Sequence, residues 1–237
     1  MNKTGIDWTE EKSNEQLEET LYFYTRNDYL IINNLLCGNL DFLWEVAHVV
    51  IKDNIGVLNE HDNGERPPLD DKTIAWLKSR IWEELDDKAK AEILEIAKQD
   101  IVTILDAMKP TKNNITLYRI IIIDDDGSRR PYTNSLSHNI GDIMEFKHIS
   151  STCIHSGYEE TTGQEEKAGY AFYRYEITIP QGGYLLDLDA LCQEDEILLP
   201  PMQCKITNIH CVDDNKNCKG VIEMRCISCQ GSHFAAL

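Results

Sequence analysis

The chain carries its most informative stretch between residues 193 and 200, which reads Gln193-Glu194-Asp195-Glu196-Ile197-Leu198-Leu199-Pro200. Two glutamates stand at alternate positions there, where a polar loop turns into an apolar strand. Because side chains two apart on a strand point the same way, we expect Glu194 and Glu196 to share one face. Two close carboxylates are costly unless positive charge comes to them. The stretch therefore predicts a site for a cation, or for positive charge that develops in a transition state.

Length and composition describe an ordinary globular chain. Its 237 residues are 42% hydrophobic, which is enough for a substantial core in one large domain or two small ones. The 41 Asp and Glu residues outnumber the 23 Lys and Arg residues, and the formal net charge is -18. Such a charge repels phosphate backbones and anionic lipid, so we expect no nucleic acid and no membrane among its partners.

Nothing in the sequence marks a membrane span or Sec-type export. No run approaches the roughly 20 apolar residues that a span needs, and Met1 to Gln16 is polar and acidic. We therefore expect a cytoplasmic protein. Its eight cysteines, most of which follow Cys192, are expected to be reduced, because a chain of this size does not need disulfides to fold.

A metal site is not expected. Cys226 and Cys229 have the spacing of a zinc knuckle, but a structural zinc site normally needs a second such pair or histidines. If the strand that begins near Val221 continued regularly to Cys229, the two thiols would also point to opposite faces. Buried, reduced cysteines in a terminal hairpin are the preferred interpretation.

Periodicity divides the chain near Pro110. Before it, helical spacing predicts five helices, which end near Tyr24, Cys37, Leu58, Leu85 and Met108. Gly38 is the predicted stop of the second helix. After it, short β-branched and aromatic runs predict strands over Thr116–Ile123, Met144–Ile149, Ala171–Ile179, Leu185–Leu188, Glu196–Leu199, Lys205–Val212 and Val221–Ile227. Helices followed by strands indicate an α+β fold with N-terminal helices packed on a β core. We expect one domain over residues 1–237, with a helical part at 1–110 and the β core at 111–237.

Motifs spread over most of the chain share the order and spacing of one known family. They are Tyr24–Tyr29 followed by Ile32–Leu36, Leu117-Tyr118-Arg119, Ile149–Cys153, Tyr175–Pro180, Gly183–Leu185 and Glu194–Pro200. Together they resemble the mono-ADP-ribosyltransferases of the cholera-toxin-like, arginine-serine-glutamate class. The resemblance implies a two-sheet β core and transfer of ADP-ribose from NAD to a protein side chain, without a metal.

The resemblance also implies a role for each motif residue. Glu196 would stabilise the oxocarbenium-like ribose as nicotinamide leaves, and Ser151 would support it by a hydrogen bond. Arg119 would hold the NAD pyrophosphate or adenosine ribose, with Ile120 and Thr152 also at the NAD site. Ile120 stands where many relatives have glycine, and Cys153 replaces the last motif serine.

Glu194 would orient the acceptor, and a glutamate at this position accompanies transfer to arginine. The loop from Asp187 to Gln193 would then contact the protein substrate. By analogy, the chain looks like a bacterial toxin or effector that reaches a host cell without a Sec signal and modifies a host protein.

Other interpretations remain open at this point. An NAD glycohydrolase would use the same site with water as the acceptor, and a non-catalytic module of this fold would bind NAD or a protein without turnover. Taken alone, Arg119 also fits a surface ion pair, and Ser151 fits a strand serine bonded to the backbone.

Overall fold

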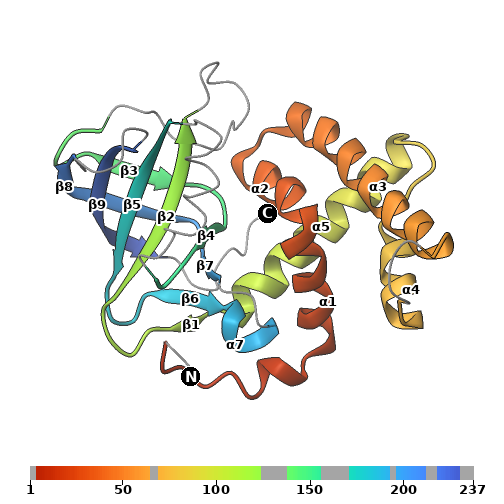
Figure 1. Ribbon diagram of the computed structural model, residues 1–237, viewed down its shortest axis with the longest axis horizontal. Coiled ribbons are helices and arrows are strands. Elements are labelled where there is room, and N and C mark those ends of the chain that lie inside the picture. Colours follow the sequence, from red (N-terminus) through yellow and green to blue (C-terminus); the bar gives the residue numbers. More distant parts are fainter. Residues whose placement is uncertain are drawn as a thin grey trace. The chain divides into compact units, whose positions relative to one another are not determined.

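The computed structural model describes residues 4–64, 69–123, 138–155, 171–192, 196–211 and 218–229 (Figure 1). The chain divides into two compact units, a helical one over Glu15–Thr103 and a mainly β one formed by Met1–Asn14 together with Ile104–Ala236. The prediction of a single domain over 1–237 stays a prediction. None of the helices in the described ranges is long and apolar enough to cross a membrane.

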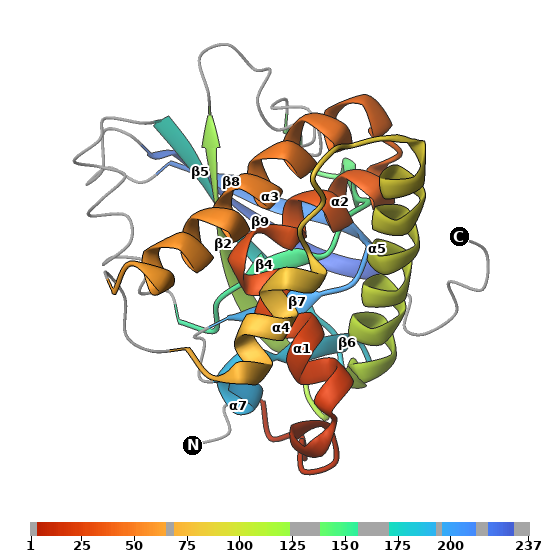
Figure 2. The same ribbon diagram turned by 90° about the vertical axis from the view of Figure 1, so that its right-hand side faces the viewer.

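The helical unit follows the predicted pattern, and Figure 2 shows α5 along one side of its other helices. Gly38, at a φ of 74°, ends α2 as predicted, because glycine adopts the left-handed conformation without a Cβ clash. Phe23, Val57 and Leu77 form a buried cluster in this unit. Its elements are α1 (Glu15–Phe23), a π-helical turn η2 (Tyr24–Asp28), α2 (Tyr29–Cys37), α3 (Leu40–Asp62), α4 (Asp71–Ser79) and α5 (Asp87–Ala107).

Helix α4 ends at Ser79, well before the predicted end at Leu85. The next residue, Arg80, is buried, and its Nη2 lies 3.1 Å from Oδ2 of Asp100. Its Nε lies 3.9 Å from Oδ2 of Asp28. We attribute the early end of the helix to this buried pairing, which periodicity alone does not reveal.

The β unit contains the predicted two sheets, one with strand order β1-β6-β7-β4 and the other with β2-β5-β9-β8-β3. All strand pairs are antiparallel except β5 with β9, which are parallel. The first sheet consists of β1 (Lys109–Pro110), β4 (Ser150–Thr152), β6 (Tyr184–Asp187) and β7 (Ile197–Leu199). The second consists of β2 (Ile115–Ile123), β3 (Ile143–Phe146), β5 (Ala171–Ile179), β8 (Met202–His210) and β9 (Cys218–Cys229).

Three short elements of this unit were not predicted: the 3-10 helix η1 (Glu11–Ser13), the strand β1 and the helix α7 (Leu188–Cys192). Strand β4 lies within the Ile149–Cys153 motif. In contrast, the predicted bounds of β5 are those observed. The predicted strand at Glu196 begins one residue later, at Ile197, and its three residues are all buried. The fold class predicted from the sequence, helices followed by a two-sheet β core, is confirmed.

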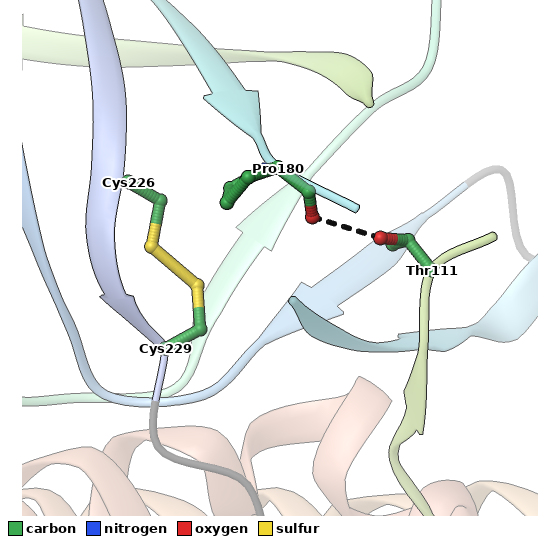
Figure 3. Close-up of a disulfide and its surroundings, with 4 residues drawn as sticks. All are labelled: Thr111, Pro180, Cys226 and Cys229. Atoms are coloured by element: carbon green, nitrogen blue, oxygen red, sulfur yellow. Dashed lines mark hydrogen bonds between the residues drawn. A yellow bond between two sulfur atoms is a disulfide. The ribbon is translucent and has the colours of Figure 1, made fainter. Parts of the chain in front are cut away.

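The prediction of reduced cysteines is wrong for one pair, because the structure joins Cys226 and Cys229 in a disulfide (Figure 3). Gln203 pairs with Ser228 and Cys204 pairs with Cys226, so Ile227 is an extra residue in β9. Such a bulge breaks the two-residue alternation that was expected to separate the two thiols. The six other cysteines, all within the described residues, are in no disulfide.

The disulfide lies beside a tight turn between β5 and β6. A Cβ added to Gly183 would lie 3.6 Å from Sγ of Cys229 and 2.6 Å from Cγ2 of Ile179. The carbonyl of Pro180 accepts a 2.9 Å hydrogen bond from the Thr111 hydroxyl (Figure 3). It accepts a second one, also of 2.9 Å, from the Gly183 N–H. Glycine at 183 therefore permits this close approach of turn and disulfide.

Candidate active site

Arg119 joins the two sheets at the centre of the candidate site. It lies in β2, and its Nη1 donates a 2.7 Å hydrogen bond to the carbonyl oxygen of Ser151 in β4. The neighbouring residues Tyr118 and Cys153 exchange two backbone hydrogen bonds of 2.8 Å. The backbone bridge holds β2 against β4, so the arginine side chain reaches the motif serine.

Ser151 and Glu196 meet across the β4–β7 pair. Ser151 is opposite Leu198 and Thr152 is opposite Ile197, which brings Glu196, just before β7, beside β4. The Ser151 hydroxyl donates a hydrogen bond to Oε1 of Glu196. The structure thus brings together three of the four predicted catalytic residues, since the fourth, Glu194, lies outside the described residues.

The two remaining predicted NAD contacts have different surroundings. Thr152 is fully buried, and its hydroxyl donates a 2.7 Å hydrogen bond to the Ile197 carbonyl, which strengthens the β4–β7 pair. Ile120 follows Arg119 in β2 and is half-buried. Because neighbouring side chains on a strand point to opposite faces, the Ile120 side chain lies on the face of β2 opposite to that of the Arg119 side chain.

The charge of Arg119 affects two buried neighbours, His148 and Tyr175, to which no role was assigned from the sequence. Burial, together with the smaller effect of the nearby Arg119 charge, lowers the pKa of His148 to about 3. Burial raises the pKa of Tyr175, whose strand position is directly opposite Arg119, although the arginine charge acts the other way. Both side chains are therefore neutral near pH 7, and Arg119 carries the positive charge of the group.

Arg119 also retains capacity to bind a ligand. Its Nε is buried and has no hydrogen-bond partner in the described part of the chain. A buried donor without a partner is costly, and a guanidinium is suited to phosphate or hydroxyl oxygens. The donor set around Arg119 therefore fits a ligand that carries such oxygens.

The segment that leads from β6 into the site is held by strand pairing and by a backbone hydrogen bond. Asp187 ends β6 and is opposite Ile197 in the register, and the Leu188 N–H donates a 2.9 Å hydrogen bond to the Glu196 carbonyl. Helix α7 occupies most of the predicted substrate-contact loop, Asp187 to Gln193. Over the described residues, no group of three or more His, Cys, Asp or Glu side chains is arranged to hold a metal ion.

Comparison with known proteins yields matches among solved structures, whereas no family model and no curated protein matches the chain. The ATR domain of Salmonella SpvB is 18% identical over 91% of this chain and 100% of that domain, with a TM-score of 0.50. C3larvin, an ADP-ribosyltransferase toxin from Paenibacillus larvae, is 16% identical over 94% of this chain and 100% of its own, at a TM-score of 0.48. Vis toxin, an ADP-ribosyltransferase from Vibrio splendidus, is 14% identical over 94% of this chain and 81% of its own, with a TM-score of 0.47.

These likenesses concern the fold. The chain has N-terminal helices followed by two β-sheets, the fold of bacterial ADP-ribosyltransferase toxins. At this level of identity, activity and acceptor have to be argued from the site itself.

Proposed function

We propose that the protein is a mono-ADP-ribosyltransferase that transfers ADP-ribose from NAD to an arginine side chain of a target protein and releases nicotinamide. The observation that carries the proposal is the hydrogen bond from the Ser151 hydroxyl to the Glu196 carboxylate, with Arg119 bonded to the same serine. The ADP-ribosyltransferase toxin fold supports NAD as the substrate.

Glu196 stabilises the transition state. As the bond between nicotinamide nitrogen and ribose C1′ breaks, its electron pair leaves with nicotinamide and positive charge develops on the ribose. The Glu196 carboxylate engages the ribose 2′-hydroxyl and balances that charge. Ser151 holds one carboxylate oxygen, which fixes the orientation of Glu196 before the reaction.

Arg119 binds the anionic or hydroxyl-rich part of NAD. One of its nitrogens is held by the Ser151 carbonyl, and its buried Nε has no partner within the described residues. Ile120 and Thr152 take part in the same binding site through their backbone, because the Ile120 side chain points to the other face of β2 and the Thr152 side chain is buried. Because His148 is neutral, Arg119 supplies the positive charge for this contact.

Glu194 serves the acceptor. Its carboxylate pairs with the guanidinium of the target arginine and takes the proton that is lost as nitrogen bonds to ribose C1′. The protein then acts as a toxin or effector on a host protein.

The test uses labelled NAD and a eukaryotic cell lysate. Wild-type protein should release nicotinamide and label a discrete protein, and Glu196→Gln should lose both activities. Glu145→Gln is the matched control, since Glu145 is an exposed residue of β3 paired with Lys147. Nicotinamide release without labelled protein would favour a glycohydrolase, and NAD binding without any release would favour a binding module.

A further inference from the structure

The Cys226–Cys229 disulfide joins two cysteines of one strand that are only three positions apart. Because it closes so short a loop, it constrains the unfolded chain little, and the β core does not depend on it for stability. Its two residues have different surroundings, since Cys226 is 2% exposed and Cys229 is half-buried. A reductant in solution therefore reaches the bond at Cys229.

One further cysteine lies beside the disulfide. Cys204 of β8 is directly opposite Cys226 in the β8–β9 register. It is completely buried, and burial raises the pKa of its thiol to about 12. Because the thiolate is the form that attacks a disulfide, Cys204 does not open the bond by internal exchange near pH 7. Opening of the bond needs a thiol from outside the chain.

The disulfide and the bulge at Ile227 depend on each other. Without the bulge, the register that sets Cys204 opposite Cys226 would continue to the end of the strand, and Cys229 would move one position along β8 from its partner Met202. The side chains of Cys226 and Cys229 would then point to opposite faces of the sheet. The end of β9 thus has two arrangements, a bulged one that allows the bond and a regular one that excludes it.

Cys229 contacts the turn that joins β5 to β6. A Cβ added to Gly183 would lie 3.6 Å from Sγ of Cys229, so the sulfur lies close to the glycine backbone. The Gly183 carbonyl accepts a 2.8 Å hydrogen bond from the Thr111 N–H, and Figure 3 shows the disulfide beside this turn. Strand β6 begins at the next residue, Tyr184, and pairs with β7, which directly follows Glu196. The disulfide therefore supports the connection that leads to the strand pair beside Glu196.

We propose that the Cys226–Cys229 disulfide is a redox switch, which holds the β5–β6 turn when oxidised and frees the end of β9 when an external dithiol reduces the bond. One thiolate of the dithiol attacks Sγ of Cys229, the S–S bond breaks, and Cys226 leaves as a thiolate that takes up a proton. The second thiol of the reductant then attacks the mixed disulfide. Cys229 leaves in turn as a thiolate and is protonated, and the reductant ends as a disulfide.

Hydrogen exchange read by mass spectrometry tests the switch on the full chain, oxidised and reduced by dithiothreitol. Amides of residues 180–185 and 227–229 should exchange about tenfold faster after reduction, while the rest of the β core keeps its protection. Cys229→Ser, which cannot form the bond, should exchange fast with or without the reductant. Cys211→Ser is the matched control, since it removes an exposed thiol that is in no disulfide and should respond to the reductant as wild type does.

Nicotinamide release measures the consequence for the site, and this part of the inference rests on the proposed transferase function. Reduction should lower the wild-type rate about threefold, because the support of the strands beside Glu196 loosens, and should not change the rate of Cys229→Ser.

Unchanged exchange at residues 180–185 after complete reduction would overturn the switch. Faster exchange with an unchanged rate in an active wild type would overturn its effect on the site. A wild type that releases no nicotinamide in either state would instead defeat the proposed function, while hydrogen exchange would still decide whether the turn responds to the disulfide.

Discussion

The Ser151 hydroxyl donates a hydrogen bond to the Glu196 carboxylate across two paired strands, although the residues are 45 positions apart in the sequence. The next serine in the chain toward the N-terminus, Ser150, is equally instructive. Its hydroxyl is fully buried and has no hydrogen-bond partner in the described part of the chain. Neighbouring serines in one strand therefore have opposite environments.

Ser151→Ala should slow nicotinamide release about 10- to 100-fold, because a hydrogen bond to a charged group contributes roughly 1.5–3 kcal/mol. Ser150→Ala, the same chemical change one residue away, should leave the rate unchanged. Steady-state NAD hydrolysis by both variants gives the comparison. Equal rates for the two variants would show that the Ser151–Glu196 bond does not contribute to catalysis.

Arg119→Lys should weaken NAD binding by about tenfold or more, because an ammonium group lacks the planar fork that bonds the Ser151 carbonyl and a ligand together. Isothermal titration with NAD measures the change. Arg225→Lys, at an exposed position of β9, is the matched control. Unchanged affinity in Arg119→Lys would remove Arg119 from the NAD site.

The buried acids of the helical unit predict a dependence of stability on pH. Burial raises the pKa of Asp28 to about 7, although Arg80 lowers it, and burial also raises the pKa of Asp100. A carboxyl group whose pKa is higher in the folded state binds its proton on folding, so its contribution to stability is present below about pH 4 and is lost as pH rises to about 7.

Asp28→Asn should remove most of this dependence. The free energy of unfolding of the variant, minus that of wild type, should therefore increase between pH 5 and pH 8, by on the order of a few kcal/mol. Urea unfolding at the two pH values measures it, and taking the difference cancels the many exposed acids common to both proteins. A difference that is the same at both pH values would contradict the assignment.

The cysteine pairing predicts a count of reactive thiols. The chain is unfolded under non-reducing conditions and treated with an alkylating agent. It should gain six labels, because Cys226 and Cys229 are joined and the six other cysteines are in no disulfide. After reduction it should gain eight, the number of cysteines in the sequence. Intact-protein mass spectrometry distinguishes the two, and eight labels without reduction would show that the disulfide does not form.

Strong local signals explain what could be predicted from the sequence. The alternating apolar run of β5 and the stop signal at Gly38 depend on nearby residues, and both are observed where predicted. The fold class followed from the change of periodicity near Pro110. Arg119, Ser151 and Glu196 were found through motif order, and the structure brings their side chains together.

Features that depend on distant contacts were not predictable. Strand β1 has two residues and exists through its pairing with β6. The disulfide depends on a bulge at Ile227, which a pattern of alternating residues cannot reveal. Likewise, Asp187 resembled an ordinary acid in an acidic chain, and its burial and its contact with Thr4, 183 residues away, appear only in the structure.

The rate of nicotinamide release from NAD, compared between wild type and Glu196→Gln, tests the central claim most directly. Replacing the carboxylate by an amide keeps the shape of the side chain but removes the charge that balances the oxocarbenium-like ribose. We predict a fall of at least about 100-fold, with folding and NAD affinity preserved. Release at the wild-type rate by Glu196→Gln would contradict the account.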